Sequence, residues 1–154
     1  MIRLKIFFVF IFLFFCYTQS YANDALTNPR DTTIYDKCVK KAQKDADDAG
    51  ADPEVALTEC ANKELKRLDK ILNDSYKKIM NSKKIDQKDK ENIKNLQRNW
   101  LAYRKHMLNT ILKYLLTDNP VGDLMIAGDK VDLLRSQAIL MDSLVLYIED
   151  GVPY

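Results

Sequence analysis

Apolar residues recur every three or four positions along most of the chain, and this spacing predicts amphipathic helices. The first predicted helix follows the start signal Asp31-Thr32-Thr33, and Gly50 interrupts its pattern. The second has Asp52 as its N-cap and Pro53 at its first position, and it continues for about seven turns to Met80. Its apolar stripe consists of Leu57, Ala61, Leu65, Leu68, Leu72, Tyr76 and Ile79.

The second half of the chain repeats this pattern twice. A third helix is predicted from Asp86, its N-cap, to a stop just before Pro120. The stretch "NPVGDLMIAGD" (119–129) is predicted to be a loop, and a last helix should extend from Asp129 to Gly151. No long stretch alternates with period two. The fold class is therefore all-α, a single-domain bundle of about four helices.

The first 22 residues have the features of a secretory signal peptide. Arg3 and Lys5 precede an unbroken apolar run at 6–15, and Ser20 and Ala22 occupy the small-residue positions of a cleavage site. An apolar run of this length is too short for a comfortable membrane span. We therefore expect cleavage after residue 22, a mature domain at 23–154 in the periplasm, and no segment embedded in the membrane.

A lipoprotein is the alternative, with Cys16 as the lipidated residue. The bulky Phe15 stands directly before this cysteine, where a lipoprotein signal has a small residue. Simple cleavage is the interpretation that this pattern favours.

Removing the signal also changes the charge balance. The chain has 24 basic and 22 acidic residues, and the signal contains Arg3 and Lys5 but no acid, so the mature formal net charge is zero. Nucleic acid is therefore not an expected partner. The charges are unevenly spread, with an acidic stretch at 23–62, a basic one at 63–113 and an acidic one at 114–154. This layout suggests charge matching between packed helices and leaves patches for a protein partner.

Two cysteines, Cys38 and Cys60, remain in the mature chain. In an oxidising compartment the simplest interpretation is one disulfide. Two free thiols or a metal-binding pair are the alternatives, and a metal would find only one histidine, His106.

Motifs for catalysis are missing. The chain lacks nucleophile-elbow, zinc-protease, P-loop and dinucleotide-binding patterns. His106 lies beside the apolar stripe of its helix, as a surface or boundary histidine does. We predict that the protein is not an enzyme, has no catalytic residues and uses no cofactor.

One segment partly resembles a calcium loop. In "DADDAGADPEVA", Asp45, Asp47 and Gly50 fit the first, third and sixth positions of an EF-hand loop. Ala49 and Ala56 occupy positions that need oxygen ligands, so we predict no metal site. The acids of this segment are instead candidate partner-binding residues or helix caps: Asp45, Asp47, Asp48, Asp52 and Glu54.

The stretch "NLQRNWLAYRKHM" (95–107) contains the single Trp of the chain. Trp100 and Tyr103 lie on the apolar stripe and are predicted to be core, although an exposed Trp–Arg face would instead be a binding hot spot. Arg104 shares this face, and a partly buried guanidinium needs a carboxylate. The candidates are Glu64, Asp69 and Asp74 on the preceding helix.

The two cysteines, the second helix around Leu68 to Tyr76 and the stretch at 95–107 together resemble the lysozyme inhibitor LprI-like family of small exported bacterial proteins. The resemblance covers about residues 35–104, and family members usually have further cysteines after the Tyr-Arg pair that this chain lacks. The matching positions are Cys38, Cys60, Leu68, Asp69, Leu72, Asn73, Tyr76, Leu96, Gln97, Trp100, Tyr103 and Arg104.

The resemblance implies a helical exported protein and, for the namesake of the family, inhibition of lysozyme. The matched apolar positions, Leu68, Leu72, Tyr76, Trp100 and Tyr103, are those predicted to form core, so they indicate a shared fold first. The matched polar positions, Asp69, Asn73, Gln97 and Arg104, are predicted to form a structural polar network.

The function predicted from these observations is a periplasmic protein that binds and inhibits a lysozyme-like peptidoglycan hydrolase. The first alternative is an immunity protein that neutralises a toxin delivered into the periplasm by a competing bacterium. The second is a structural envelope protein. Both inhibitor and immunity protein require a protein partner and no turnover.

Overall fold

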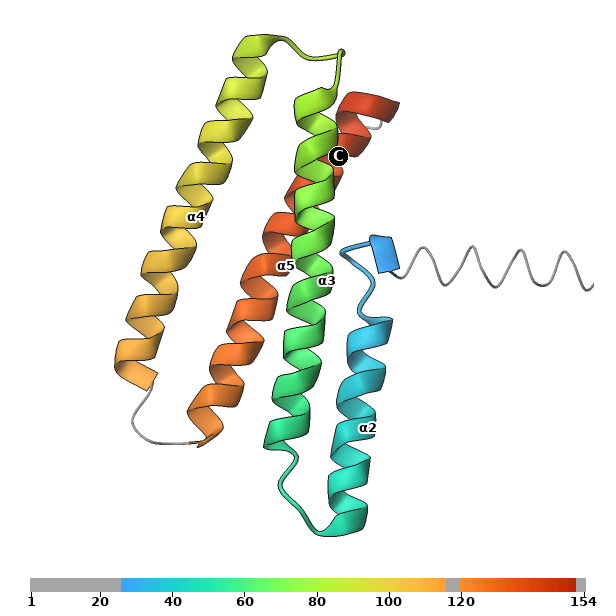
Figure 1. Cartoon of the computed structure of the whole chain (residues 1–154), viewed down its shortest axis with the longest axis vertical. Coiled ribbons are helices and arrows are strands. Elements are labelled where there is room, and N and C mark those ends of the chain that lie inside the picture. Colours follow the sequence, from blue (N-terminus) through green and yellow to red (C-terminus); the bar gives the residue numbers. More distant parts are fainter. Residues whose placement is uncertain (1–25, 116–119, 152–154) are drawn as a thin grey trace, which may run out of the picture.

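The described part of the chain is built mainly from four long helices (Figure 1). The computed structural model describes residues 26–115 and 120–151, excepting the side chains of 111–115 and 120–123; the predicted signal peptide lies outside these residues. The helices are α2 (Thr33–Ala49), α3 (Glu54–Asn81), α4 (Gln87–Leu115) and α5 (Pro120–Asp150). Helix α3 packs along α5, α2 packs on α3, and α4 packs mainly on α5. The predicted all-α bundle of four helices is confirmed.

Aspartates precede three of these helices and glycines follow two of them, although the N-cap of α3 is Pro53 and not the predicted Asp52. Asp31, Asp52 and Asp86 each accept a hydrogen bond from a backbone amide of the first turn, at 2.8–2.9 Å. Gly50 and Gly151 follow α2 and α5 with φ of 63° and 68°. This left-handed conformation is one that glycine adopts without strain, and it lets each amide bond back to the preceding turn.

The hydrogen-bonded Asp31 carboxylate before α2 predicts that the stability of the fold depends on pH. Hydrogen bonds from the Thr33 side chain and backbone, with a smaller contribution from Arg67, lower the pKa of Asp31. A lowered pKa in the folded state stabilises the fold above the pKa of the unfolded chain, and this contribution disappears as pH falls below about 4. Asp31→Asn keeps a capping side chain without the charge, so it should show a smaller loss of stability between about pH 7 and pH 2.5 than wild type. Urea unfolding at both pH values tests this, and equal losses would contradict it.

The start of α5 corrects the sequence prediction. Residues 119–129 were expected to be a loop, but α5 begins at Pro120 and includes Gly122 and Gly128. Proline is favourable at a first helical position, and each interior glycine costs about 1 kcal/mol. Burial of Ile126, which is 2% exposed, contributes roughly 1.5–3 kcal/mol and offsets much of that cost.

The main core lies between α3 and α5. It contains Leu68, Leu72 and Ile79 from α3 and Val131, Leu134, Ala138 and Met141 from α5. Tyr76 and Trp100, two of the predicted core residues, are partly buried and pack against this cluster. The prediction for Tyr103 is wrong, because this side chain is 55% exposed. It lies on the flank of the α4 stripe, and α4 packs mainly on one neighbour, so that flank stays open.

A disulfide joins α2 to α3. Cys38 and Cys60 are bonded, with their Cα atoms 5.8 Å apart. Cys60 is buried in a second, smaller cluster with Ala42 and Leu57. The predicted pairing is confirmed, and it fixes the α2–α3 hairpin near its middle.

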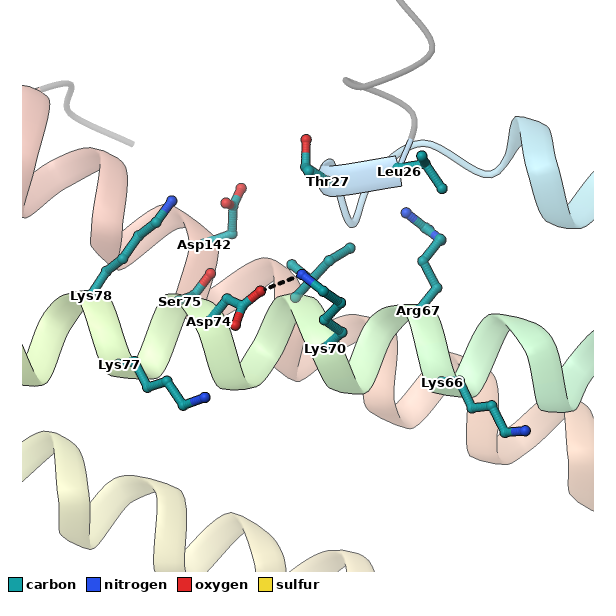
Figure 2. Close-up of a pocket in the computed structure, with 11 residues that line it drawn as sticks. Leu26, Thr27, Lys66, Arg67, Lys70, Asp74, Ser75, Lys77, Lys78 and Asp142 are labelled. Carbon is teal, nitrogen blue, oxygen red and sulfur yellow. Dashed lines mark hydrogen bonds and ion pairs between the residues drawn. The ribbon is translucent and has the colours of Figure 1, made fainter.

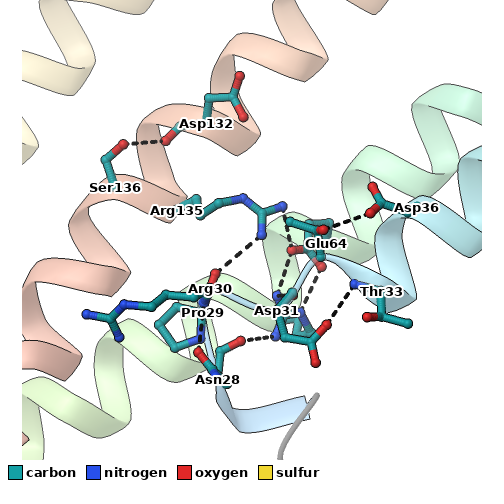
Figure 3. A network of polar contacts seen from close by, with 12 residues as sticks. Asn28, Pro29, Arg30, Asp31, Thr33, Asp36, Glu64, Asp132, Arg135 and Ser136 are labelled. Carbon is teal, nitrogen blue, oxygen red and sulfur yellow. Dashed lines mark hydrogen bonds and ion pairs between the residues drawn. The ribbon is translucent and has the colours of Figure 1, made fainter.

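A buried ionic network holds the segment before α2 against the bundle (Figure 3). The Glu64 carboxylate on α3 accepts hydrogen bonds from Arg67, at 2.7 and 2.8 Å, and lies 2.9 Å from a guanidinium nitrogen of Arg135 on α5. The two arginines also donate to backbone carbonyls of Asn28, Pro29 and Asp31. The Glu64 side chain is only 2% exposed, so its charge must be compensated within the protein, and the guanidiniums of Arg67 and Arg135 do this.

Candidate functional site

A groove separates α3 from α4, and more than half of the residues that carried the family resemblance line it. Four residues of α3, at spacings of three and four, form one wall: Asp69, Leu72, Asn73 and Tyr76. Residues of α4 form the other: Lys94, Gln97, Arg98, Trp100, Leu101 and Arg104. The groove has a volume of about 320 Å³. It exists because α4 packs mainly on α5 and leaves the space beside α3 open.

The four residues of the predicted polar network surround this groove, but they do not all bond to one another. The Asn73 amide donates to the Asp69 carboxylate at 3.0 Å and to its backbone carbonyl at 2.8 Å. Gln97 accepts a hydrogen bond of 2.8 Å from Gln137 on α5. Gln137 was not predicted from the sequence, although a glutamine within the apolar stripe of the last helix indicates a buried polar contact.

Arg104 lies over the ring of Trp100, with its guanidinium carbon 5.5 Å from the ring centre. This distance is within the range of a cation–π contact. The Nε atom of Arg104 is buried and has no hydrogen-bond partner. The predicted ion pair between Arg104 and an acid of the preceding helix is not formed among the described residues.

The acidic segment forms the exposed tip of the α2–α3 hairpin. Asp45, Asp47, Asp48 and Asp52 are exposed, and Glu54 is partly exposed at the start of α3. Asp45 forms an ion pair with Lys41, and the Asp52 carboxylate accepts a hydrogen bond from the backbone amide of Glu54. Beside them Val55 is 82% exposed. The tip thus presents carboxylates around a protruding apolar side chain, on a hairpin that the disulfide constrains.

A basic surface lies along the second half of α3. Figure 2 shows Lys66, Lys70, Lys77 and Lys78 on this helix, beside a hollow of about 730 Å³ that Leu26 and Thr27 approach from the other side. Asp74 bonds to Lys70 at 2.7 Å, and this contact lowers the pKa of its carboxyl. The basic surface and the acidic tip therefore occupy different parts of the bundle.

Within 26–115 and 120–151, no group of three or more His, Cys, Asp or Glu residues is placed to hold a metal ion. His106 is exposed on α4. In the same ranges no helix is both long and apolar enough to cross a membrane.

The fold and the site define a small helical protein with a disulfide-linked hairpin, a charged surface and a groove lined by charged and aromatic side chains. The family model described as lysozyme inhibitor LprI matches residues 27–114, more than half of the chain. The chain therefore belongs to the LprI lysozyme inhibitor family. Comparisons with curated proteins and with solved structures give no match.

Proposed function

We propose that residues 1–22 direct export and that the mature domain, 23–154, binds and inhibits a lysozyme-like peptidoglycan hydrolase in the periplasm. The observation that carries this proposal is membership of the lysozyme inhibitor family, whose model matches α2, α3 and nearly all of α4. Inhibition of this kind requires a tight protein complex and no catalytic residues. The disulfide between Cys38 and Cys60 supports an oxidising compartment.

We assign first contact with the hydrolase to the acidic tip. Its carboxylates would steer the inhibitor toward a cationic surface, because complementary charge raises the association rate. Val55, at 82% exposed, supplies an apolar contact at the centre of the tip. Since the disulfide constrains the hairpin before binding, little conformational entropy would be lost when the complex forms.

The test is a cell-wall turbidity assay. Purified, oxidised residues 23–154 are titrated against a panel of lysozymes, and we expect stoichiometric inhibition of at least one. No inhibition of any enzyme at large excess would contradict the proposed function.

A matched pair of variants locates the surface. Asp47→Asn with Asp48→Asn should lower the association rate roughly 3- to 10-fold at low salt, with a smaller effect at high salt. The control, Asp89→Asn with Asp150→Asn, removes the same charge from exposed positions at the start of α4 and the end of α5. Equal effects of the two pairs would contradict the assignment to the tip. A larger effect of Lys77→Gln with Lys78→Gln would assign contact to the basic surface, which would then approach the catalytic carboxylates of a glycosidase.

A further inference from the structure

The α3–α4 groove contains the one buried side-chain polar atom, among the described residues, that has no hydrogen-bond partner. This atom belongs to the guanidinium of Arg104. Trp100 lies beneath it at 5.5 Å, and its Nε atom is buried without a hydrogen-bond acceptor. Polar groups withdrawn from water are nearly always hydrogen-bonded, and a charged donor without an acceptor is especially costly. Because Nε itself is closed to solvent, an acceptor from outside the chain would bond to the terminal amino groups and supply the charge compensation that the guanidinium lacks.

The three acids of α3 that were candidate partners for Arg104 are bonded to other groups. Glu64 is bound by Arg67 and Arg135 in the buried network between α3, α5 and the segment before α2. Asp69 accepts from the Asn73 amide, and Asp74 pairs with Lys70. None of the three has a bond to Arg104. The described part of the chain therefore holds this arginine in place by stacking it on an aromatic ring and leaves its donors without a carboxylate.

The other residues that line the groove fit an anionic ligand with an uncharged body. Lys94 and Arg98 add positive charge, and Asp69 is the one acid among the described lining residues. Tyr76, Trp100 and Leu101 provide an aromatic and aliphatic surface beside the charges. A volume of about 320 Å³ is at the small end of the range for ligand pockets, which suits a single sugar or amino acid.

We propose that the α3–α4 groove is a binding site for a small carboxylate-bearing ligand. Arg104 pairs with the carboxylate through its planar set of donors, and Arg98 adds a second cation. The uncharged body of the ligand lies against Trp100 and Tyr76. This site is separate from the acidic tip and does not require a hydrolase, so it can fail or succeed independently of the proposed function.

The single Trp of the chain makes the test direct, because Trp100 lies in the groove itself. Its fluorescence is followed while mature, oxidised protein is titrated with three probes. N-acetylmuramic acid and N-acetylglucosamine differ by one lactyl carboxylate, and N-acetylglutamate carries carboxylates without a sugar. We expect a saturable change with at least one carboxylate probe and binding of N-acetylglucosamine at least about tenfold weaker. The stronger of the two carboxylate probes identifies the ligand as an acidic sugar or an acidic amino acid.

Variants of α4 assign the effect to Arg104. Arg104→Gln should weaken binding of the carboxylate probe by about tenfold to a hundredfold, and Arg104→Lys should fall between this variant and wild type. Lys105→Gln removes the same charge at the next, exposed position and should bind like wild type. Circular dichroism and urea unfolding check that each variant is folded. The proposal is overturned if neither carboxylate probe gives a saturable change, if N-acetylglucosamine binds equally well, or if folded Arg104→Gln binds as wild type does.

Discussion

Replacing Glu64 by Gln is expected to lower the free energy of unfolding by about 3–5 kcal/mol. The Glu64 side chain is 2% exposed and contacts two guanidiniums whose own side chains are 10% and 13% exposed. Glutamine has a similar shape but no charge, so the two buried cations would lose the carboxylate that they share. Because Arg67 and Arg135 also hold the backbone of 28–31, that segment should exchange its amide hydrogens faster in the variant.

The control for this prediction lies on the same helix. Glu59 pairs with Lys63 at 2.8 Å, but both side chains are about two-thirds exposed, so Glu59→Gln should cost no more than about 1 kcal/mol. Adding Arg135→Met to Glu64→Gln should recover part of the loss, since it removes one of the two buried cations that shared the carboxylate. Equal unfolding free energies for the Glu59 and Glu64 variants in urea would show that the network contributes no more than a surface pair.

The helices and their ends could be predicted because their causes are local. Apolar residues at spacings of three and four, an aspartate before each of the first three helices, and Gly50 and Gly151 after two of them act within one or two turns. The disulfide needed one more argument, that two cysteines in an exported chain pair. The prediction for the start of α5 was wrong because two glycines near a proline indicate a loop locally. Burial of Ile126 in the tertiary structure offsets much of their cost in a helix.

The polar contacts depend on which helices are neighbours, and a sequence pattern does not specify that. Glu64 was considered as a partner for Arg104, yet it faces Arg135 on α5 and the segment before α2. Tyr103 fits the apolar stripe of α4, but that helix packs mainly on α5 and leaves one flank of the stripe exposed. The same arrangement opens the groove that brings Asp69, Asn73 and Arg104 to one place. Most of the groove residues were thus predicted from the sequence to lie together, but as parts of a closed helix–helix interface.

Removing the disulfide is the second change with a large expected effect. Cys38 and Cys60 are separated by 22 positions, and the chain-entropy model gives roughly 3 kcal/mol for closing such a loop. The fully buried residues of α2 are only Ala42 and Ala46, whose small side chains bury little apolar surface. The bond is therefore expected to supply much of what holds α2 against α3.

The double variant Cys38→Ala, Cys60→Ala should unfold at a lower urea concentration than oxidised wild type, by an amount that corresponds to about 3 kcal/mol. Hydrogen exchange should accelerate in α2, while the core of α3 and α5 around Leu68 and Met141 stays protected. Wild type treated with reductant should match the variant, and the variant itself should be insensitive to reductant.

If the acidic tip makes the first contact with a hydrolase, loosening α2 should also weaken inhibition more than it weakens carboxylate binding in the α3–α4 groove, because α2 contributes no residue to that groove. Unchanged exchange in α2 would show that the packing of Tyr35, Ala42 and Ala46 suffices to hold the hairpin together without the bond.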